Sequence, residues 1–236
     1  MDRKKFIRNS ILGIASLATA SKILESCSKS DNDDSVTNSS TDGSCTVSPA
    51  ETKGPFPIKT PSQLVLENIK SDRIGVALLI NLTIQNKNNN CSPLQGVLVD
   101  VWHCDKDGNY SEYGGTSMQQ TDYTSVHFLR GRQTTNSKGE VSFISIFPGW
   151  YQGRAPHVHV EIMTSNGTSL LVTQIAFPEN ISTEVYSSTN YAAHGQADTS
   201  NTKDNVFSDS LANELATLTG NLTDGYTLSK TITVNG

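Results

Sequence analysis

Residues 128–160 read FLRGRQTTNSKGEVSFISIFPGWYQGRAPHVHV, and this stretch decides the predicted fold. Two runs rich in β-branched and aromatic residues flank the polar turn at 136–139, which is the pattern of a β-hairpin. A Pro-Gly break at 148 and 149 separates the second run from a third that begins at His157. We therefore expect three consecutive strands in this part of the chain.

The same pattern continues on both sides of this stretch. Further strand-like runs, separated by polar turns, occupy residues 74–84, 96–103, 168–177 and 226–234. A spacing of about ten residues per strand is typical of a β-sandwich. Helical spacing is found in one segment, residues 207–219. The sequence thus predicts a mainly β fold, a single β-sandwich domain with long loops and at most short helices.

The N-terminus has the layout of a secretory signal. Residues 2–8 are basic, residues 11–21 are apolar, and Leu24-Glu25-Ser26-Cys27 follows. The apolar run is too short to span a bilayer. Because the closing motif resembles a bacterial lipobox, we expect residues 1–26 to be a lipoprotein signal peptide and a lipid on Cys27 to attach an exported protein to a membrane. Plain secretion with an incidental cysteine is the alternative. The sequence does not distinguish Sec export from twin-arginine export.

Residues 27–44 are almost free of apolar side chains and should form a flexible polar tether. The folded domain is then expected at 45–236. The formal net charge of −5 becomes −8 without residues 1–26, which carry five basic and two acidic side chains. A negative chain of this kind argues against nucleic acid as a partner.

Three cysteines follow Cys27, and an exported protein meets an oxidising compartment in which pairs of thiols tend to form disulfides. Cys91 and Cys104 flank the strand-like run at 97–103, whereas Cys45 lies at the edge of the tether. We favour Cys91–Cys104 as the pair, with Cys91–Cys45 as the alternative.

His157 and His159 alternate with valines in the third run, so both imidazoles point to the same face of a strand. Two imidazoles on a buried face need partners for their nitrogens, and a metal ion is one such partner. A hydrogen-bonded surface pair is the alternative. Tyr151 lies six residues before His157, and Tyr110 ends a polar turn; neither tyrosine is diagnostic alone, since most tyrosines are packing residues.

The stretch 128–160 as a whole resembles the core of the intradiol ring-cleavage dioxygenases. Three further segments match that family in the same order: ETKGPFP at 51–57, GVLVDVWHCDKDGNYSEY at 96–113 and TQIAFPE at 173–179. The resemblance covers about 45–236 and is closest to the exported single-domain branch. Arg-Ala-Pro-His at 154–157 departs from the Arg-Pro-Ala-His of many cytosolic members, which keeps the spacing but alters the local turn.

The resemblance implies one Fe(III) per subunit with four protein ligands, Tyr110, Tyr151, His157 and His159. It also implies that Arg154 is the active-site arginine, that Gln174 lies near the iron and that Tyr151 acts as a base. Phenolate and imidazole are ligands that favour ferric over ferrous iron.

The implied activity is cleavage of a catecholic compound by O2 to a muconate-type dicarboxylate. The identity of the catechol and the oligomeric state stay open. The alternative is a non-catalytic β-sandwich lipoprotein that binds a metal or a catechol, which would not need the tyrosines and Arg154 at these spacings.

Overall fold

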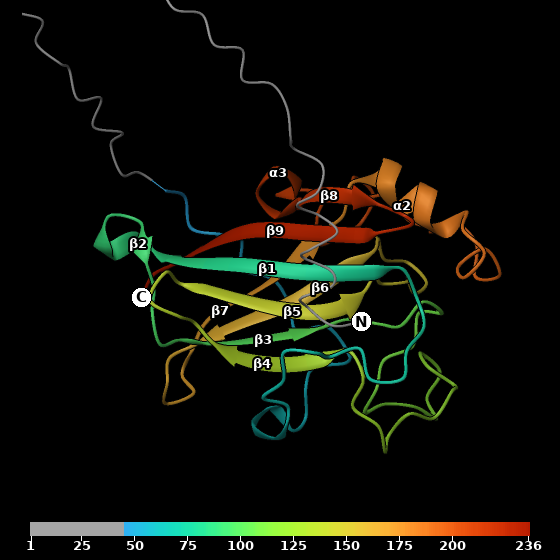
Figure 1. Ribbon diagram of the computed structural model, residues 1–236, viewed down its shortest axis with the longest axis horizontal. Helices are drawn as coiled ribbons and strands as arrows, with labels where there is room; N and C mark the ends of the chain where they lie inside the picture. Colours follow the sequence, from blue (N-terminus) through green and yellow to red (C-terminus); the bar gives the residue numbers. More distant parts are fainter. Residues whose placement is uncertain (1–44) are drawn as a thin grey trace, which may run out of the picture.

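The computed structural model describes residues 45–236, so the predicted signal peptide and tether lie outside the described residues. The described chain forms two β-sheets packed face to face (Figure 1). The larger sheet has the order β2-β1-β9-β8, with β5 also pairing with β1, and consists of β1 Ala77–Asn86, β2 Ser92–Pro93, β5 Glu140–Ile146, β8 Thr217–Asn221 and β9 Gly225–Val234. The predicted mainly β architecture is confirmed.

The smaller sheet carries the residues of interest. Its order is β4-β3-β6-β7, and its antiparallel strands are β3 Leu98–Trp102, β4 Arg130–Thr134, β6 His157–Met163 and β7 Ser169–Ala176. Val158, Val160 and Ile162 of β6 are fully buried in the core cluster that also contains Ile80 and Leu82 of β1. Because side chains alternate along a strand, His157 and His159 lie on the opposite, outer face of the sheet.

That outer face is buried as well, because a segment near the start of the domain crosses it. We call residues 51–58 the covering segment. Glu51 N donates to Val172 O of β7 at 2.7 Å, and Gly54 packs so closely that a Cβ atom there would lie 3.0 Å from His159 Cε1. Gly54 also has a φ of +67°, which favours glycine. All seven residues of β6 are therefore buried, and the histidines are shielded from solvent.

The helices differ from the sequence prediction. Only the middle of the predicted segment at 207–219 is helical, as α3 Leu211–Glu214, because Ala216 N donates to Ala176 O and the residues from Thr217 pair with β9 as strand β8. A second helix, α2 Glu179–Tyr186, was not predicted. Two 3-10 turns lie at Pro61–Gln63 and Lys87–Asn89. Within 45–236, none of the helices is both long and apolar enough to cross a membrane.

The favoured disulfide was wrong. Cys45 is bonded to Cys91, with 5.9 Å between their Cα atoms, whereas Cys104 is a buried free thiol. Cys91 and Cys104 stand at opposite ends of the run that includes β3, and each extended residue adds about 3.3 Å. The pair is thus too far apart for a bond that needs Cα atoms within about 7 Å. The disulfide instead fixes the start of the domain beside β2.

One carboxyl group on α3 gives the stability a pH dependence. Glu214 is only 1% exposed, and burial raises its pKa from 4.5 to about 7, with Glu51 and Asp209 adding in the same direction against a hydrogen bond from Ser210. Between these two pH values the folded protein keeps a proton that the unfolded chain has released. The contribution of Glu214 to stability should therefore fall as the pH rises from 4.5 to 7.

We expect Glu214→Gln to remove this contribution, because a neutral side chain has no proton to lose. The variant should match the wild type at pH 4.5 and be more stable by about 1 kcal/mol at pH values above roughly 8, a figure reduced for solvent screening. Denaturant unfolding across this pH range measures the difference. Glu140→Gln, which changes an exposed glutamate of β5, is the control; a Glu214→Gln profile parallel to the wild type would contradict the assignment.

Candidate functional site

Two histidines of β6 form the base of the candidate site. His157 and His159 are 2% and 1% exposed, and their Nε2 atoms lie 3.1 Å apart. His157 Nδ1 is 2.6 Å from Ala155 O, so a proton on Nδ1 leaves the Nε2 lone pair free. His159 is held differently, by parallel stacking on Trp102 of β3 with 4.9 Å between ring centroids.

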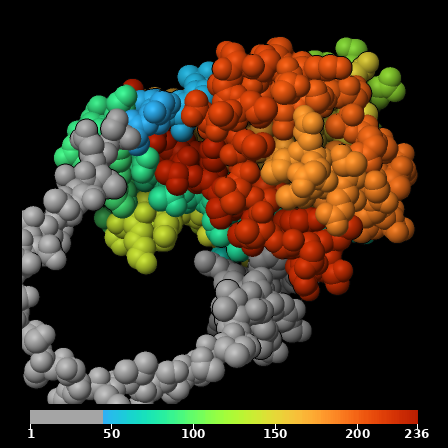
Figure 2. All heavy atoms as spheres, turned by 90° about the horizontal axis from the view of Figure 1, so that it is seen from above, coloured from blue at the N-terminus to red at the C-terminus, as the bar shows by residue number. Residues whose placement is uncertain are grey.

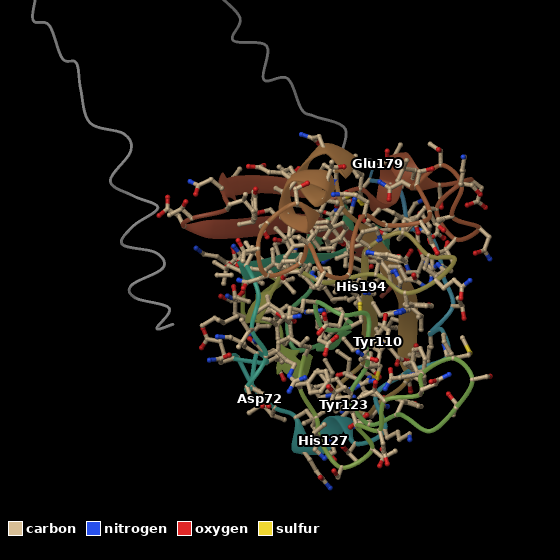
Figure 3. All side chains as sticks on the ribbon, turned by 90° about the vertical axis from the view of Figure 1, so that its right-hand side faces the viewer. Asp72, Tyr110, Tyr123, His127, Glu179 and His194 are labelled. Carbon is tan, nitrogen blue, oxygen red and sulfur yellow. A yellow bond between two sulfur atoms is a disulfide. The ribbon has the colours of Figure 1, made fainter. Side chains whose placement is uncertain are left out.

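Tyr110 reaches these histidines from the turn after β3. The Asp105 carboxylate accepts from the backbone N–H of Asp107 and of Asn109, which closes the turn. The φ of Gly108 is +80°, and a Cβ there would lie 2.2 Å from Trp150 O, so this position needs glycine. The turn therefore packs against the segment that carries Tyr151. Tyr110 Oη lies 3.2 Å from His157 Nε2, and Figure 3 shows Tyr110 inside the domain.

Tyr151 completes the group from the segment after the Pro-Gly break. Gly149 allows the close approach, since a Cβ there would lie 2.5 Å from Asp105 O. The Tyr151 ring lies 5.6 Å from the His157 ring and 5.8 Å from the Tyr110 ring, between centroids. The structure thus brings together all four side chains that the sequence analysis named as ligands.

Arg154 and Gln174 lie at the edge of this group. Arg154 Nη1 donates to Tyr151 Oη at 3.3 Å, and Nη2 donates to Gln174 Oε1 at 2.7 Å. Gln174 faces His159 across the β6–β7 pairing, and its Nε2 donates to Thr52 O of the covering segment at 2.9 Å. Arg154 therefore contacts the donor Tyr151, and Gln174 lies beside the donor His159. Gln174 also links Arg154 to the covering segment.

Burial favours the neutral form of all four donors. Burial, and then the charge of Arg154, lowers the pKa of His157 to about 3. Burial and then His157 place the pKa of His159 well below its usual range. Burial raises the pKa of Tyr110 well above 10 and also raises that of Tyr151, against the effect of Arg154. The histidines are thus neutral lone-pair donors, and the phenols ionise near neutral pH only if a strong positive charge is adjacent.

The donor set fits a ferric ion. The donors here are two imidazoles and two phenols. Among residues 45–236, no group of three His, Cys, Asp or Glu side chains that could hold a metal ion is found. Two ligands at right angles, each about 2.1 Å from one ion, would lie about 3 Å apart. The separations of 3.1 and 3.2 Å from His157 Nε2 to His159 Nε2 and Tyr110 Oη match this value. Hard phenolate oxygens favour the ferric state.

Several side chains at the site were not identified from sequence. Phe56 stacks on Tyr110 at 4.7 Å and lies edge-on to Tyr151. The fully buried Arg130 donates to Phe56 O at 2.9 Å and to Ser111 O at 2.6 Å, so it joins the covering segment to the Tyr110 loop. Phe56 lies within a segment that carried the family resemblance. Arg130 lies within another such segment, 128–160, but the resemblance gave it no role.

A comparison with protein families gives a match over residues 57–212 to a family described as Dioxygenase. Among curated proteins, chlorocatechol 1,2-dioxygenase of Rhodococcus opacus is 30% identical over 105 residues, which cover 36% of this chain and 38% of that enzyme. The chain thus matches well under half of that relative's length.

Solved structures give broader matches. An intradiol ring-cleavage dioxygenase from Tetranychus urticae superposes with a TM-score of 0.72 at 30% identity, over 81% of this chain and 95% of that one. The dioxygenase domain of a carbohydrate-binding fusion protein from Streptomyces sp. SirexAA-E gives a TM-score of 0.56 at 24% identity, over 80% and 97% of the two chains. The second match shows a common fold.

Proposed function

Because the chain belongs to the intradiol ring-cleavage dioxygenase family, we propose that it uses ferric iron and O2 to cleave a catecholic ring between its two hydroxylated carbons. Both oxygen atoms of O2 enter the product, a muconate-type dicarboxylate. The observation that carries the proposal is the convergence of two neutral imidazoles and two phenols, with Arg154 donating to one phenol.

Tyr110, Tyr151, His157 and His159 would hold the iron. Their two phenolates offset two of its three positive charges, which reduces the penalty for burying the ion. Ferric iron, when bound, withdraws electron density from a chelated catecholate and makes its ring carbons reactive toward O2. The covering segment and the stacked pair of Trp102 and His159 keep bulk water from the inner side of the centre.

Tyr151 is the residue suited to move a proton. It is less buried than Tyr110, and Arg154 opposes the effect of burial on the pKa of its phenol. Tyr151 would accept a proton from a catechol hydroxyl as the substrate binds. Arg154 would then direct Nη1 toward the negative charge that develops on the substrate during attack by O2. Gln174 would keep Nη2 engaged and so limit the freedom of the guanidinium.

The cellular location belongs to the proposal as well. The basic and apolar stretches of residues 1–26, followed by Cys27, support export and attachment to a bacterial membrane through a lipid. A protein so placed would meet catechols from outside the cytoplasm.

Iron loading and visible spectroscopy test the proposal. The purified protein should bind about one ferric ion per chain and show a red phenolate-to-iron band, which should shift when catechol or protocatechuate is added without oxygen. Admitting O2 should then release a dicarboxylate that mass spectrometry identifies. A colourless protein that binds only zinc, or no metal, would instead indicate a non-catalytic binding lipoprotein.

A further inference from the structure

One fully buried carboxylate reaches the site from a distant part of the chain. Asp204 is 0% exposed and lies in the long segment between α2 and α3, fifty positions after Arg154. Figure 2 shows the orange residues that follow β7 covering one end of the molecule. A carboxylate is rarely buried so completely unless its oxygens are satisfied, so its partners show what it does.

Asp204 binds one edge of the Arg154 guanidinium. Arg154 Nε donates to both carboxylate oxygens, at 3.1 and 2.9 Å. The two Nη atoms point the other way and donate to Tyr151 Oη and Gln174 Oε1. The carboxylate thus binds the Nε edge of the guanidinium and leaves both Nη atoms to contact Tyr151 and Gln174. It also supplies the charge that makes a buried guanidinium tolerable.

The same carboxylate fixes the backbone before His157. Asp204 Oδ2 accepts from Ala155 N at 2.7 Å, and Oδ1 accepts from Val206 N at 2.9 Å. Ala155 O in turn lies 2.6 Å from His157 Nδ1. One anchor therefore sets both the direction of Arg154 and the position of the carbonyl that orients His157.

We propose that Asp204 is a positioning residue, which holds the Arg154 guanidinium against Tyr151 and Gln174 and fixes the 154–155 backbone that orients His157. Its role in turnover rests on the proposed function; its role as an anchor does not. The hydrogen bonds of the Asp204 side chain go to Arg154, Ala155 and Val206, so it reaches the donors through Arg154 and Ala155.

A neighbouring aspartate provides a matched control. The Asp198 carboxylate accepts from Gly153 N at 3.1 and 3.2 Å, so it binds the same loop as Asp204. It is exposed and does not contact Arg154. Asp204→Asn and Asp198→Asn therefore differ in whether the guanidinium loses its anchor.

The first experiment tests the anchor in the iron-free protein by NMR. A guanidinium Nε–H held by a buried carboxylate exchanges slowly with water and gives a sharp signal, assigned here by its loss in Arg154→Lys. We expect Asp204→Asn to broaden or remove the signal and Asp198→Asn to keep it. If Asp204→Asn does not fold, Asp204→Glu is measured and should shift the signal. An unchanged signal in the Asp204 variant overturns the proposal.

The second experiment is a double-mutant cycle on the iron-loaded enzyme. Asp204→Asn should lower kcat/KM by about 10- to 100-fold while iron content and the visible band stay near those of the wild type. Asn keeps an oxygen that can accept from Ala155 N, so the loss is expected to arise through Arg154. Adding Asp204→Asn to Arg154→Gln, in which the ion pair is already absent, should therefore lower kcat/KM by less than about threefold more. An equal loss in both backgrounds would indicate a general structural effect and overturn the proposal. If the wild type neither binds iron nor cleaves catechols, the proposed function fails, whereas the NMR result still decides the anchor.

Discussion

An enzyme with Lys in place of Arg154 is expected to keep its iron and its colour and to lose about 100- to 1,000-fold in kcat. The lysine ammonium can still pair with Asp204, so the buried carboxylate is not left unpaired. It cannot also donate to Tyr151 Oη and Gln174 Oε1, as the planar guanidinium does. The loss should therefore appear in the chemical step, measured by single-turnover oxygen consumption after anaerobic substrate binding.

Arg132→Lys is the matched control for this prediction. Arg132 of β4 also forms a two-contact pair with a buried aspartate, Asp100, at 2.5 and 2.8 Å, but it lies outside the group of donors. That variant should retain near wild-type turnover. The role given to Arg154 is wrong if Arg154→Lys turns over at the wild-type rate, or if it loses iron along with activity.

Replacing His157 with Ala is expected to abolish both iron binding and ring cleavage. His157 Nε2 lies within 3.2 Å of both His159 Nε2 and Tyr110 Oη, so it is the central member of the donor group. Without it, three donors remain and the nitrogen between His159 and Tyr110 is lost, so a ferric ion cannot be retained tightly. Metal analysis after dialysis against a chelator, together with the visible spectrum, measures the loss.

His127→Ala is the comparison for this variant. The His127 side chain is 43% exposed and pairs with Glu112 at 2.8 Å, and Figure 3 places it at the edge of the domain away from Tyr110. Its removal should leave the iron in place. Iron retained by His157→Ala at one per chain would exclude the ligand set proposed here.

Strand spacing predicted a β-sandwich and each of its strands except β2 and β8, because most strands bury one face in a shared core. The run at 157–163 shows why burial of the outer face of the smaller sheet could not be predicted. Its alternation predicted that the two histidines share a face, but it could not reveal that the covering segment buries that face too. The same limit explains the helix ends, since the hydrogen bond from Ala216 to Ala176 and the pairing of β8 with β9 override local helical spacing.

The candidate donors were predicted from the family resemblance, and the structure brings them together. Residues that act through contacts distant in sequence left no such signal. Asp204 lies in a polar stretch that reads as an ordinary loop, and only the folded chain places it against Arg154. The disulfide was misassigned for the same reason, because proximity along the sequence favoured Cys104 over Cys45.

The Cys45–Cys91 bond joins the start of the domain to the residue before β2, with the covering segment inside the closed loop. It therefore holds the chain just before the covering segment, which lies over the four donors. Reduction would remove one attachment before the covering segment and leave the hydrogen bonds of Ser48 and Glu51 to the two sheets. If the proposed ferric ion is bound, a chelator should therefore remove it faster from the reduced protein than from the oxidised one. Retention of the proposed ion would then depend on the redox state of the surroundings.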